Sequence, residues 1–137
     1  MESCTEKITQ GTKHSVTEKV TEKNTAIALG SGSMDVYATP AMTCLMERAA
    51  TEAVEPLLSP GWTTVGISLN VQHKAATPVG IEVRAEAQVQ SVDGRKIVFA
   101  VNAYDEHGEI GSGVHERFAV LKEKFMAKAL AKKERAI

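Results

Sequence analysis

The segment TPAMTCLMERAATEAVEPLL, residues 39–58, has the pattern of a helix that is buried on most sides. Thr39 is a candidate cap and Pro40 stands at the first helical position, both typical of a helix start. Pro56 and the turn at residues 59–61 predict its end. The apolar positions cover nearly the whole circumference and are Ala41, Met42, Cys44, Leu45, Met46, Ala49, Ala50, Ala53 and Val54. Such a helix is expected at the centre of the fold.

Period-two alternation follows this helix and predicts four consecutive antiparallel strands. The stretches are residues 64–75, 81–90, 97–103 and 109–122. Asp93-Gly94 is a strong hairpin signal, and residues 106–108 form a second turn. Gly111 and Gly113 predict a bulge or a bend in the last strand. One further strand candidate, TKHSVTEKV at residues 12–20, precedes the helix.

The row of inward-facing side chains in residues 64–75 ends in a histidine. One face is predicted to carry Val65, Ile67, Leu69 and Val71, and the opposite face Gly66, Ser68, Asn70 and Gln72. His73 continues the apolar row. An ionisable ring is therefore expected at the end of a half-buried strand.

An antiparallel sheet with one apolar face needs a cover, and the apolar helix provides it. Wrapping the sheet around the helix satisfies both and predicts an α+β hotdog fold. A single sheet of this kind leaves an edge strand exposed. Two copies are therefore expected to join their sheets into a homodimer, with a dimer of dimers as the larger alternative.

Length and composition fit one ordinary domain, residues 1–137. Residues 1–10 are expected to be flexible and residues 122–137 to form a helix or tail. The formal charge of −1 gives no reason to expect nucleic-acid binding. No apolar run reaches the ~20 residues of a membrane span. The amino terminus MESCTEKITQ lacks an apolar signal region, which predicts a cytoplasmic protein.

Cys4 and Cys44 are the two cysteines, and their spacing does not fit a metal site. Cys44 lies within an apolar run and is predicted to be a reduced thiol in the core. Residues 28–40, ALGSGSMDVYATP, concentrate small and turn-forming residues and predict a mobile connector.

A carboxylate in the buried helix is unexpected, because an unpaired charge in an apolar interior is costly. Glu47 occupies such a position, and Thr39, two turns earlier, shares its face. The rise between them is roughly 12 Å, which leaves room for a substrate carbonyl and for the ring of His73. Taken singly, each has an ordinary explanation: Glu47 as a paired or edge carboxylate near Arg48, His73 as a half-buried histidine, Thr39 as a cap.

Four segments resemble the hotdog thioesterase family that includes fluoroacetyl-CoA thioesterase. They are VYATPAMTCLMERAA, TTVGISLNVQHKAATPVG, SVDGRKI and EIGSGVHERFAV, and the likeness extends from about Val36 to Lys128. The resemblance implies hydrolysis of a short or medium acyl-CoA, without a cofactor. It further implies a catalytic set of Thr39, Glu47 and His73, with the backbone of Gly66 close to the acyl group.

Several roles remain open within that set. Glu47 either attacks the thioester or deprotonates water; His73 either orients water or protonates the thiolate. Thr39 either bonds the carboxylate or is the nucleophile. The N–H groups of Ala41 and Met42 are candidate oxyanion donors and substrate contacts. Whether Glu47 and His73 meet within one chain or across the dimer is also open.

The chain departs from the family in the connector, because residues 24–36 contain no aromatic side chain to form a lid. Selectivity for fluoroacetyl-CoA is therefore not expected. Candidate partners for the phosphates of coenzyme A are Lys74, Arg95, Lys96, Arg117 and Lys122. His115 and Arg117 are equally candidates to brace the dimer and are assigned no chemistry. Rival functions are a hotdog hydratase or dehydratase and a non-catalytic acyl-CoA binding module.

Overall fold

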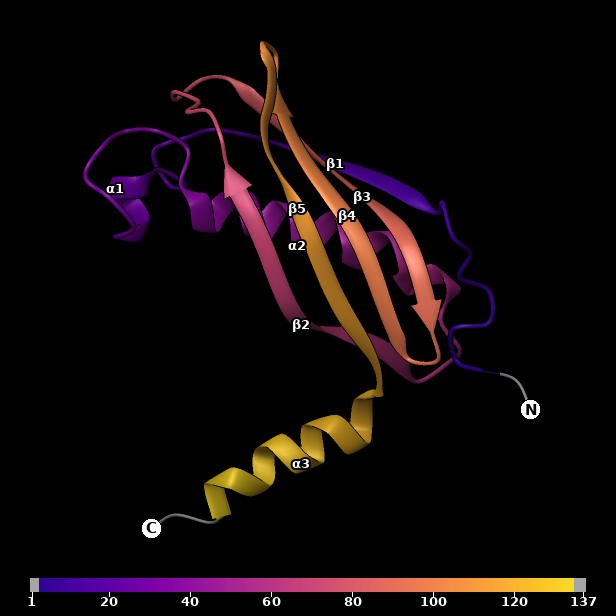
Figure 1. Cartoon of the computed structure of the whole chain (residues 1–137). Coiled ribbons are helices and arrows are strands. Elements are labelled where there is room, and N and C mark those ends of the chain that lie inside the picture. The colour runs from indigo at the N-terminus through magenta and orange to yellow at the C-terminus, as the bar shows by residue number, and fades with distance from the viewer. Residues whose placement is uncertain (1–2, 135–137) are drawn as a thin grey trace.

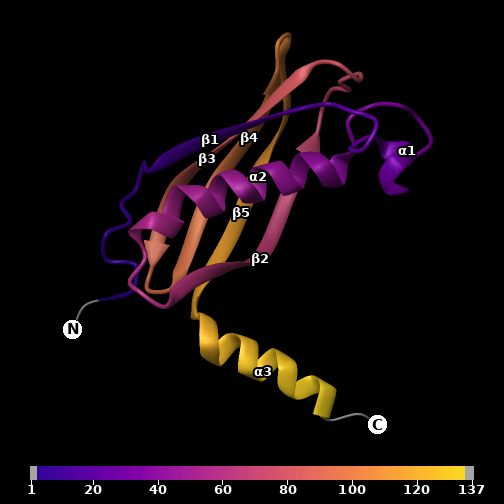
Figure 2. The same ribbon diagram turned by 180° about the vertical axis from the view of Figure 1, so that it is seen from behind.

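Five antiparallel strands and one long helix build the chain in a computed structural model that describes residues 3–134. The strands are β1 (Lys13–Lys19), β2 (Trp62–His73), β3 (Glu82–Asp93), β4 (Lys96–Asp105) and β5 (Gly108–Leu121). The helices are α1 (Ala26–Leu29), α2 (Thr39–Val54), the 3-10 turn η1 (Glu55–Leu57) and α3 (Lys122–Glu134). The strand order is β1-β3-β4-β5-β2, and α2 lies across one face of the sheet (Figures 1 and 2). The predicted α+β hotdog fold is confirmed.

The core forms where the sheet faces α2. Alternate side chains of β3 and β4 are buried against the helix: Val83, Ala85, Ala87, Val89, Ile97, Phe99, Val101 and Ala103. Many of these residues are alanine, as are several on the facing side of the helix, so the helix and the sheet can approach closely. The turn predicted at Asp93-Gly94 connects β3 to β4, and the turn predicted at residues 106–108 connects β4 to β5.

Only one face of α2 is buried, contrary to the prediction of a helix enclosed on most sides. Its buried residues are Ala41, Met42, Leu45, Met46, Ala49, Ala50, Ala53 and Val54. The opposite side exposes Cys44, Arg48 and Glu52, so the prediction of Cys44 as a core thiol is wrong. The reason is geometric, since a single sheet can cover only one side of a helix.

Strand β2 has one free edge, because among residues 3–134 only β5 pairs with it. Its pairing shifts between Gly66 and Ser68, which makes Ile67 the bulged residue. Gly66 pairs with Arg117 and Leu69 with His115, so Gly66 and Leu69 share the inner face. The predicted unbroken row from Val65 to Val71 is therefore wrong, because the bulge changes its phase.

The chain before β1 packs against the sheet rather than being loose. Thr5 and Ile8 are buried, and the Thr5 hydroxyl donates to the Gly94 carbonyl oxygen at 2.6 Å. Residues 1–2 of the segment predicted to be flexible lie outside the described residues. So do residues 135–137 of the predicted carboxyl-terminal helix or tail, whose described part is α3.

The connector before α2 and the helix after β5 both extend beyond the sheet (Figure 1). In the connector, Thr25 caps α1 and forms a bridge with Tyr37, while Val36 forms a bridge with Pro78. Helix α3 projects from the end of β5 and buries none of its described residues (Figures 1 and 2). Within residues 3–134, no helix has the length and apolar character to cross a membrane.

Candidate active site

The carboxylate of Glu47 lies against a buried cation in the middle of the sheet. Glu47 Oε2 accepts a hydrogen bond from Arg117 Nη1 at 3.3 Å and lies 3.8 Å from His115 Nε2. Arg117 and His115 project inward from β5 and are almost fully buried. The Glu47 side chain itself retains 43% exposure. The expectation of a carboxylate in apolar surroundings is therefore wrong, and the alternative of a paired or edge carboxylate holds, with Arg117 in place of Arg48 as the partner.

Thr64 holds the guanidinium of Arg117 in place. The Thr64 hydroxyl accepts from Arg117 Nε at 2.8 Å, and its backbone oxygen accepts from Nη2 at 3.0 Å. Burial lowers the pKa of Arg117, and the neighbouring Glu47 opposes that change. Arginine remains protonated under these conditions. Glu47 therefore faces a fixed positive charge, which sequence reasoning did not assign to it.

Gly66 lies directly beside this carboxylate. A Cβ atom added there would approach Glu47 Oε2 to 2.7 Å and His115 Cε1 to 3.2 Å. The first distance is shorter than an ordinary van der Waals contact, so a methyl group would displace the carboxylate. The position predicted for close backbone approach is thus the position where only glycine leaves Glu47 undisturbed.

Gly66→Ala is expected to lower the turnover of any reaction that uses Glu47, by about tenfold or more, because small misplacements of a reacting group are costly. Steady-state kinetics would measure this effect. A thermal unfolding curve of the variant is the control, because a native-like transition would show that the added methyl group acts at Glu47 and not on the fold as a whole. Equal turnover in the Gly66→Ala variant and the wild type would contradict the importance of this contact.

A second cluster forms where α2 begins and β2 ends. Thr39 Oγ1 and His73 Nδ1 are 2.8 Å apart. The opposite ring nitrogen, His73 Nε2, is buried and has no hydrogen-bond partner among residues 3–134. Burial is the main cause that lowers the pKa of His73. The neutral ring therefore presents an unsatisfied nitrogen, which is costly unless a ligand or water meets it.

Thr39 is not the helix cap that the sequence suggested. The N-cap residue is Ala38, which has no side chain to cap with, and Thr39 is the first helical residue. Its hydroxyl is consequently available to His73. The neutral, hydrogen-bonded pair can pass a proton between a substrate atom and the ring.

Tyr37 supports this second cluster and was not identified from the sequence. Its buried ring meets His73 edge-on, with the ring centroids 6.5 Å apart. The Tyr37 hydroxyl donates to the Glu18 carboxylate. Burial, and then the Glu18 carboxylate, raise the pKa of Tyr37 far above its usual value. A neutral tyrosine thus limits the movement of the His73 ring.

Of the two predicted oxyanion donors, one is already used. The Met42 N–H donates to the Ala38 carbonyl oxygen at 3.0 Å, and the Met42 side chain packs beside Gly111. Ala41 has no backbone acceptor among the described residues. It lines a cavity of about 260 Å³ between the connector and α2, together with Leu29, Pro40 and Cys44. Ala41 therefore remains the better candidate.

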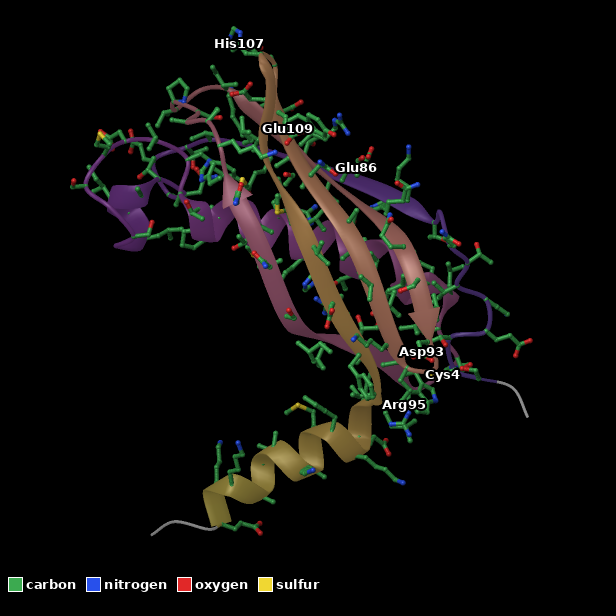
Figure 3. All side chains as sticks on the ribbon, viewed as in Figure 1. Cys4, Glu86, Asp93, Arg95, His107 and Glu109 are labelled. Atoms are coloured by element: carbon green, nitrogen blue, oxygen red, sulfur yellow. The ribbon has the colours of Figure 1, made fainter. Side chains whose placement is uncertain are left out.

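The cations predicted for coenzyme A are scattered. Lys74 forms an ion pair with Glu109 at 2.6 Å, and Lys96 pairs with Glu116 at 3.5 Å. Lys122 begins α3. Arg95 lies over the ring of Trp62 at 5.2 Å, at the opposite end of the sheet from Glu109 (Figure 3). Arg117 is buried and hydrogen-bonded to Glu47, so its prediction as a phosphate ligand is wrong. The bracing of a dimer by His115 and Arg117 stays a prediction.

The geometry thus contains two separate clusters within the chain. Thr39 contacts His73, Glu47 contacts Arg117, and no hydrogen bond joins the clusters among the described residues. Within residues 3–134, no group of three or more His, Cys, Asp or Glu side chains is arranged to hold a metal ion. The chemistry that these clusters support is acid–base or nucleophilic chemistry of carboxylate and imidazole.

Comparison with known proteins gives a consistent result. A family model described as fluoroacetyl-CoA-specific thioesterase matches residues 20–123. Fluoroacetyl-CoA thioesterase of Streptantibioticus cattleyicolor is 45% identical over 98 residues, which cover 72% of this chain and 70% of that protein. A solved structure of a fluoroacetyl-CoA thioesterase superposes with a TM-score of 0.86 at 37% identity, covering 91% and 97% of the two chains. A hypothetical protein of Thermus thermophilus, a thioesterase superfamily member, superposes with a TM-score of 0.87 at 30% identity, covering 93% and 95%.

Proposed function

The chain belongs to the family of fluoroacetyl-CoA-specific thioesterases and hydrolyses acyl-CoA thioesters, and we propose that Thr39, Glu47 and His73 carry out this reaction on a short acyl group. The observation that carries the assignment is the buried Nε2 atom of His73, which lacks a partner among the described residues. An unsatisfied ring nitrogen beside a hydroxyl is the arrangement that a proton-transfer site needs before substrate arrives.

Hydrolysis requires an oxygen nucleophile to attack the thioester carbonyl carbon, after which the carbon–sulfur bond breaks. Glu47 provides the carboxylate, either by attacking the carbon directly to form a mixed anhydride that water then hydrolyses, or by taking a proton from the attacking water. The guanidinium of Arg117 keeps the carboxylate oriented, and the absence of a side chain at Gly66 leaves it undisturbed. The Ala41 N–H at the start of α2, which has no backbone acceptor among the described residues, would stabilise the oxyanion.

His73, oriented by Thr39, acts on the attacking water and on the departing thiolate. The His73 ring, held by Thr39 at 2.8 Å, presents Nε2 to the reacting atoms. It orients the water, or it accepts the proton released by the attacking water and passes it to the sulfur as the carbon–sulfur bond breaks. Thr39 fixes the ring nitrogen on the opposite side, which determines the direction in which Nε2 points. This division of roles requires Glu47 and His73 to act on one bound substrate.

The two clusters come together, in our proposal, through a second copy of the chain. Within one chain, Gly66 and His73 are separated by roughly 23 Å of extended strand. The free edge of β2 is exposed, and Ile67 on it is 52% exposed. Antiparallel pairing of two such edges would bring the partner's His73 toward the segment that contains Gly66. The homodimer would then place Glu47 of one subunit opposite the Thr39–His73 pair of the other.

Mixing two inactive variants tests this arrangement. Glu47→Gln and His73→Ala chains, refolded together in equal amounts, are expected to recover about one quarter of wild-type activity. Half of the dimers would be mixed, and each would have one intact site if the site is shared. Sedimentation would first establish that the protein is dimeric. No recovery in a mixture that contains mixed dimers would place the whole site within one chain.

A short acyl group fits the proposal better than a long one. The family to which the chain belongs is described as specific for fluoroacetyl-CoA, whose acyl group has two carbons. Residues 24–36 contain no aromatic side chain, and Tyr37, which follows them, is buried against Glu18 and His73. We therefore propose short acyl-CoA substrates without selectivity for fluoroacetyl-CoA.

A panel of acyl-CoA thioesters with a thiol-reactive dye tests both parts of this proposal. Thiol release is expected to be fastest for acyl chains of about two to six carbons, because the family and the curated relative are named for a two-carbon acyl group. Acetyl-CoA and fluoroacetyl-CoA are expected to be hydrolysed with similar kcat/KM. A strong preference for fluoroacetyl-CoA would contradict the inference from the connector. Turnover of enoyl-CoA without thiol release would favour a hydratase instead.

A further inference from the structure

His115 is a buried imidazole that has no role in the reaction as described so far. Its Nδ1 atom lies 2.8 Å from the backbone oxygen of Ser68, and its Nε2 atom lies 3.1 Å from Arg117 Nη1. The ring of Phe99 stacks on it with a centroid separation of 6.1 Å. Strands β2, β4 and β5 thus each contribute one contact to the ring. The hydrogen-bond partners of the two ring nitrogens indicate the protonation state of His115.

Those partners permit one neutral form only. A backbone carbonyl only accepts hydrogen bonds, so Nδ1 carries the proton. A guanidinium only donates, so Nε2 presents its lone pair to Arg117. The Ser68 carbonyl oxygen, which accepts the hydrogen bond from the ring, belongs to the residue that directly follows the bulge in β2. The local backbone of an edge strand thus selects the tautomer of His115.

We infer that His115, as a neutral imidazole protonated on Nδ1, is a positioning residue that aims Arg117 at the carboxylate of Glu47. Arg117 Nη1 carries two hydrogens, of which one is taken by His115 and the other meets Glu47 Oε2 at 3.3 Å. Thr64 accepts hydrogen bonds from the Nε–H and from one N–H of Nη2. Without an acceptor at His115, only Thr64 would hold the guanidinium on the side away from Glu47, and the Nη1 hydrogen that faces His115 would lose its partner. The inference rests on the proposed role of Glu47.

Protonation of His115 would reverse this arrangement. Nε2 would then carry a hydrogen directed at the N–H of Arg117, and two positive charges would face each other. The charged groups around the ring are Arg117 on β5 and Glu47 on α2, the latter 3.8 Å from Nε2. Burial is the main cause that lowers the pKa of His115, and the positive charge of Arg117 adds to it. Activity should therefore survive mild acid and fall as pH drops through this lowered pKa.

Two substitutions of the same chemical class separate positioning from packing. The shorter amide introduced by His115→Asn reaches the Ser68 carbonyl but not Arg117, whereas the longer amide introduced by His115→Gln reaches Arg117 and offers it an oxygen. Both remove the ring from Phe99. We expect kcat to fall about tenfold or more in His115→Asn and by less than about threefold in His115→Gln, with KM little changed in either.

The pH profile gives the second readout. In the wild type, protonation of His115 and protonation of His73 should both lower kcat/KM as the pH falls. In His115→Gln, the decrease caused by His115 should be absent, and the decrease caused by His73 should remain. A packing role would lower kcat equally in both variants and leave the acid limb unchanged, and that result would overturn the inference. So would equal wild-type activity in both variants.

One measurement on the unaltered protein is independent of activity. Nitrogen NMR of the labelled imidazole is expected to show His115 neutral and protonated on Nδ1 at neutral pH. A spectrum with Nε2 protonated, or with both nitrogens protonated, would overturn the inference even if thioesterase activity behaved as proposed. If the tautomer is as expected but Glu47→Gln retains activity, the proposed function of Glu47 fails instead.

Discussion

Replacing Glu47 with glutamine is expected to lower kcat/KM for acyl-CoA hydrolysis by about a thousandfold or more, roughly 4 kcal/mol of transition-state stabilisation. The amide oxygen can still accept the hydrogen bond from Arg117 Nη1, so the local packing should survive. What is lost is the negative charge that attacks the carbonyl or takes the proton of water. Thiol release under saturating and subsaturating acyl-CoA would measure the loss.

Glu52→Gln provides the matched control for this substitution. Glu52 lies on the same helix, pairs with Arg48 at 2.9 Å and is more than a turn away from Glu47. The same chemical change there should leave kcat/KM within about twofold of the wild-type value, since a surface ion pair contributes little to the stability of the fold. Wild-type activity in Glu47→Gln, or comparable losses in both variants, would remove Glu47 from the reaction.

Replacing His73 with alanine is expected to lower kcat by about a hundredfold or more, the usual contribution of one acid–base group. The variant removes the buried Nε2 atom and leaves Thr39 without its partner at 2.8 Å. KM should change less than kcat, because proton transfer is needed in the transition state and not for binding. Steady-state kinetics with one short acyl-CoA would separate the two parameters.

His107→Ala is the control for the loss of a histidine. His107 lies at the exposed tip of the β4–β5 hairpin (Figure 3), where its ring lies 3.9 Å from the carboxylate of the neighbouring Glu106. Its removal should not alter hydrolysis. A thermal unfolding curve for His73→Ala should show a native-like transition, because the substitution removes an unsatisfied buried atom along with the ring. Unchanged kcat in a folded His73→Ala protein would show that the ring is a structural residue.

The sequence alone determined the fold and the identity of three candidate residues. The alternation in β3 and β4 and the apolar positions of α2 recur with regular spacing, and such periods depend only on the local backbone geometry. A carboxylate among those apolar positions and a histidine at the end of a strand were visible for the same reason. Given the order of the elements, packing the sheet against the one long apolar helix was the simplest way to cover its apolar face.

The tertiary structure alone decided the partners of those residues. Glu47 meets Arg117, which lies 70 positions later, and not His73. That pairing depends on the bulge at Gly66–Ser68 and on the register of β2 against β5. Cross-strand register is a long-range property, since a shift of one residue moves every side chain to the other face. No local period encodes it, and so the charge that holds Glu47 and the tautomer of His115 emerged only from the folded chain.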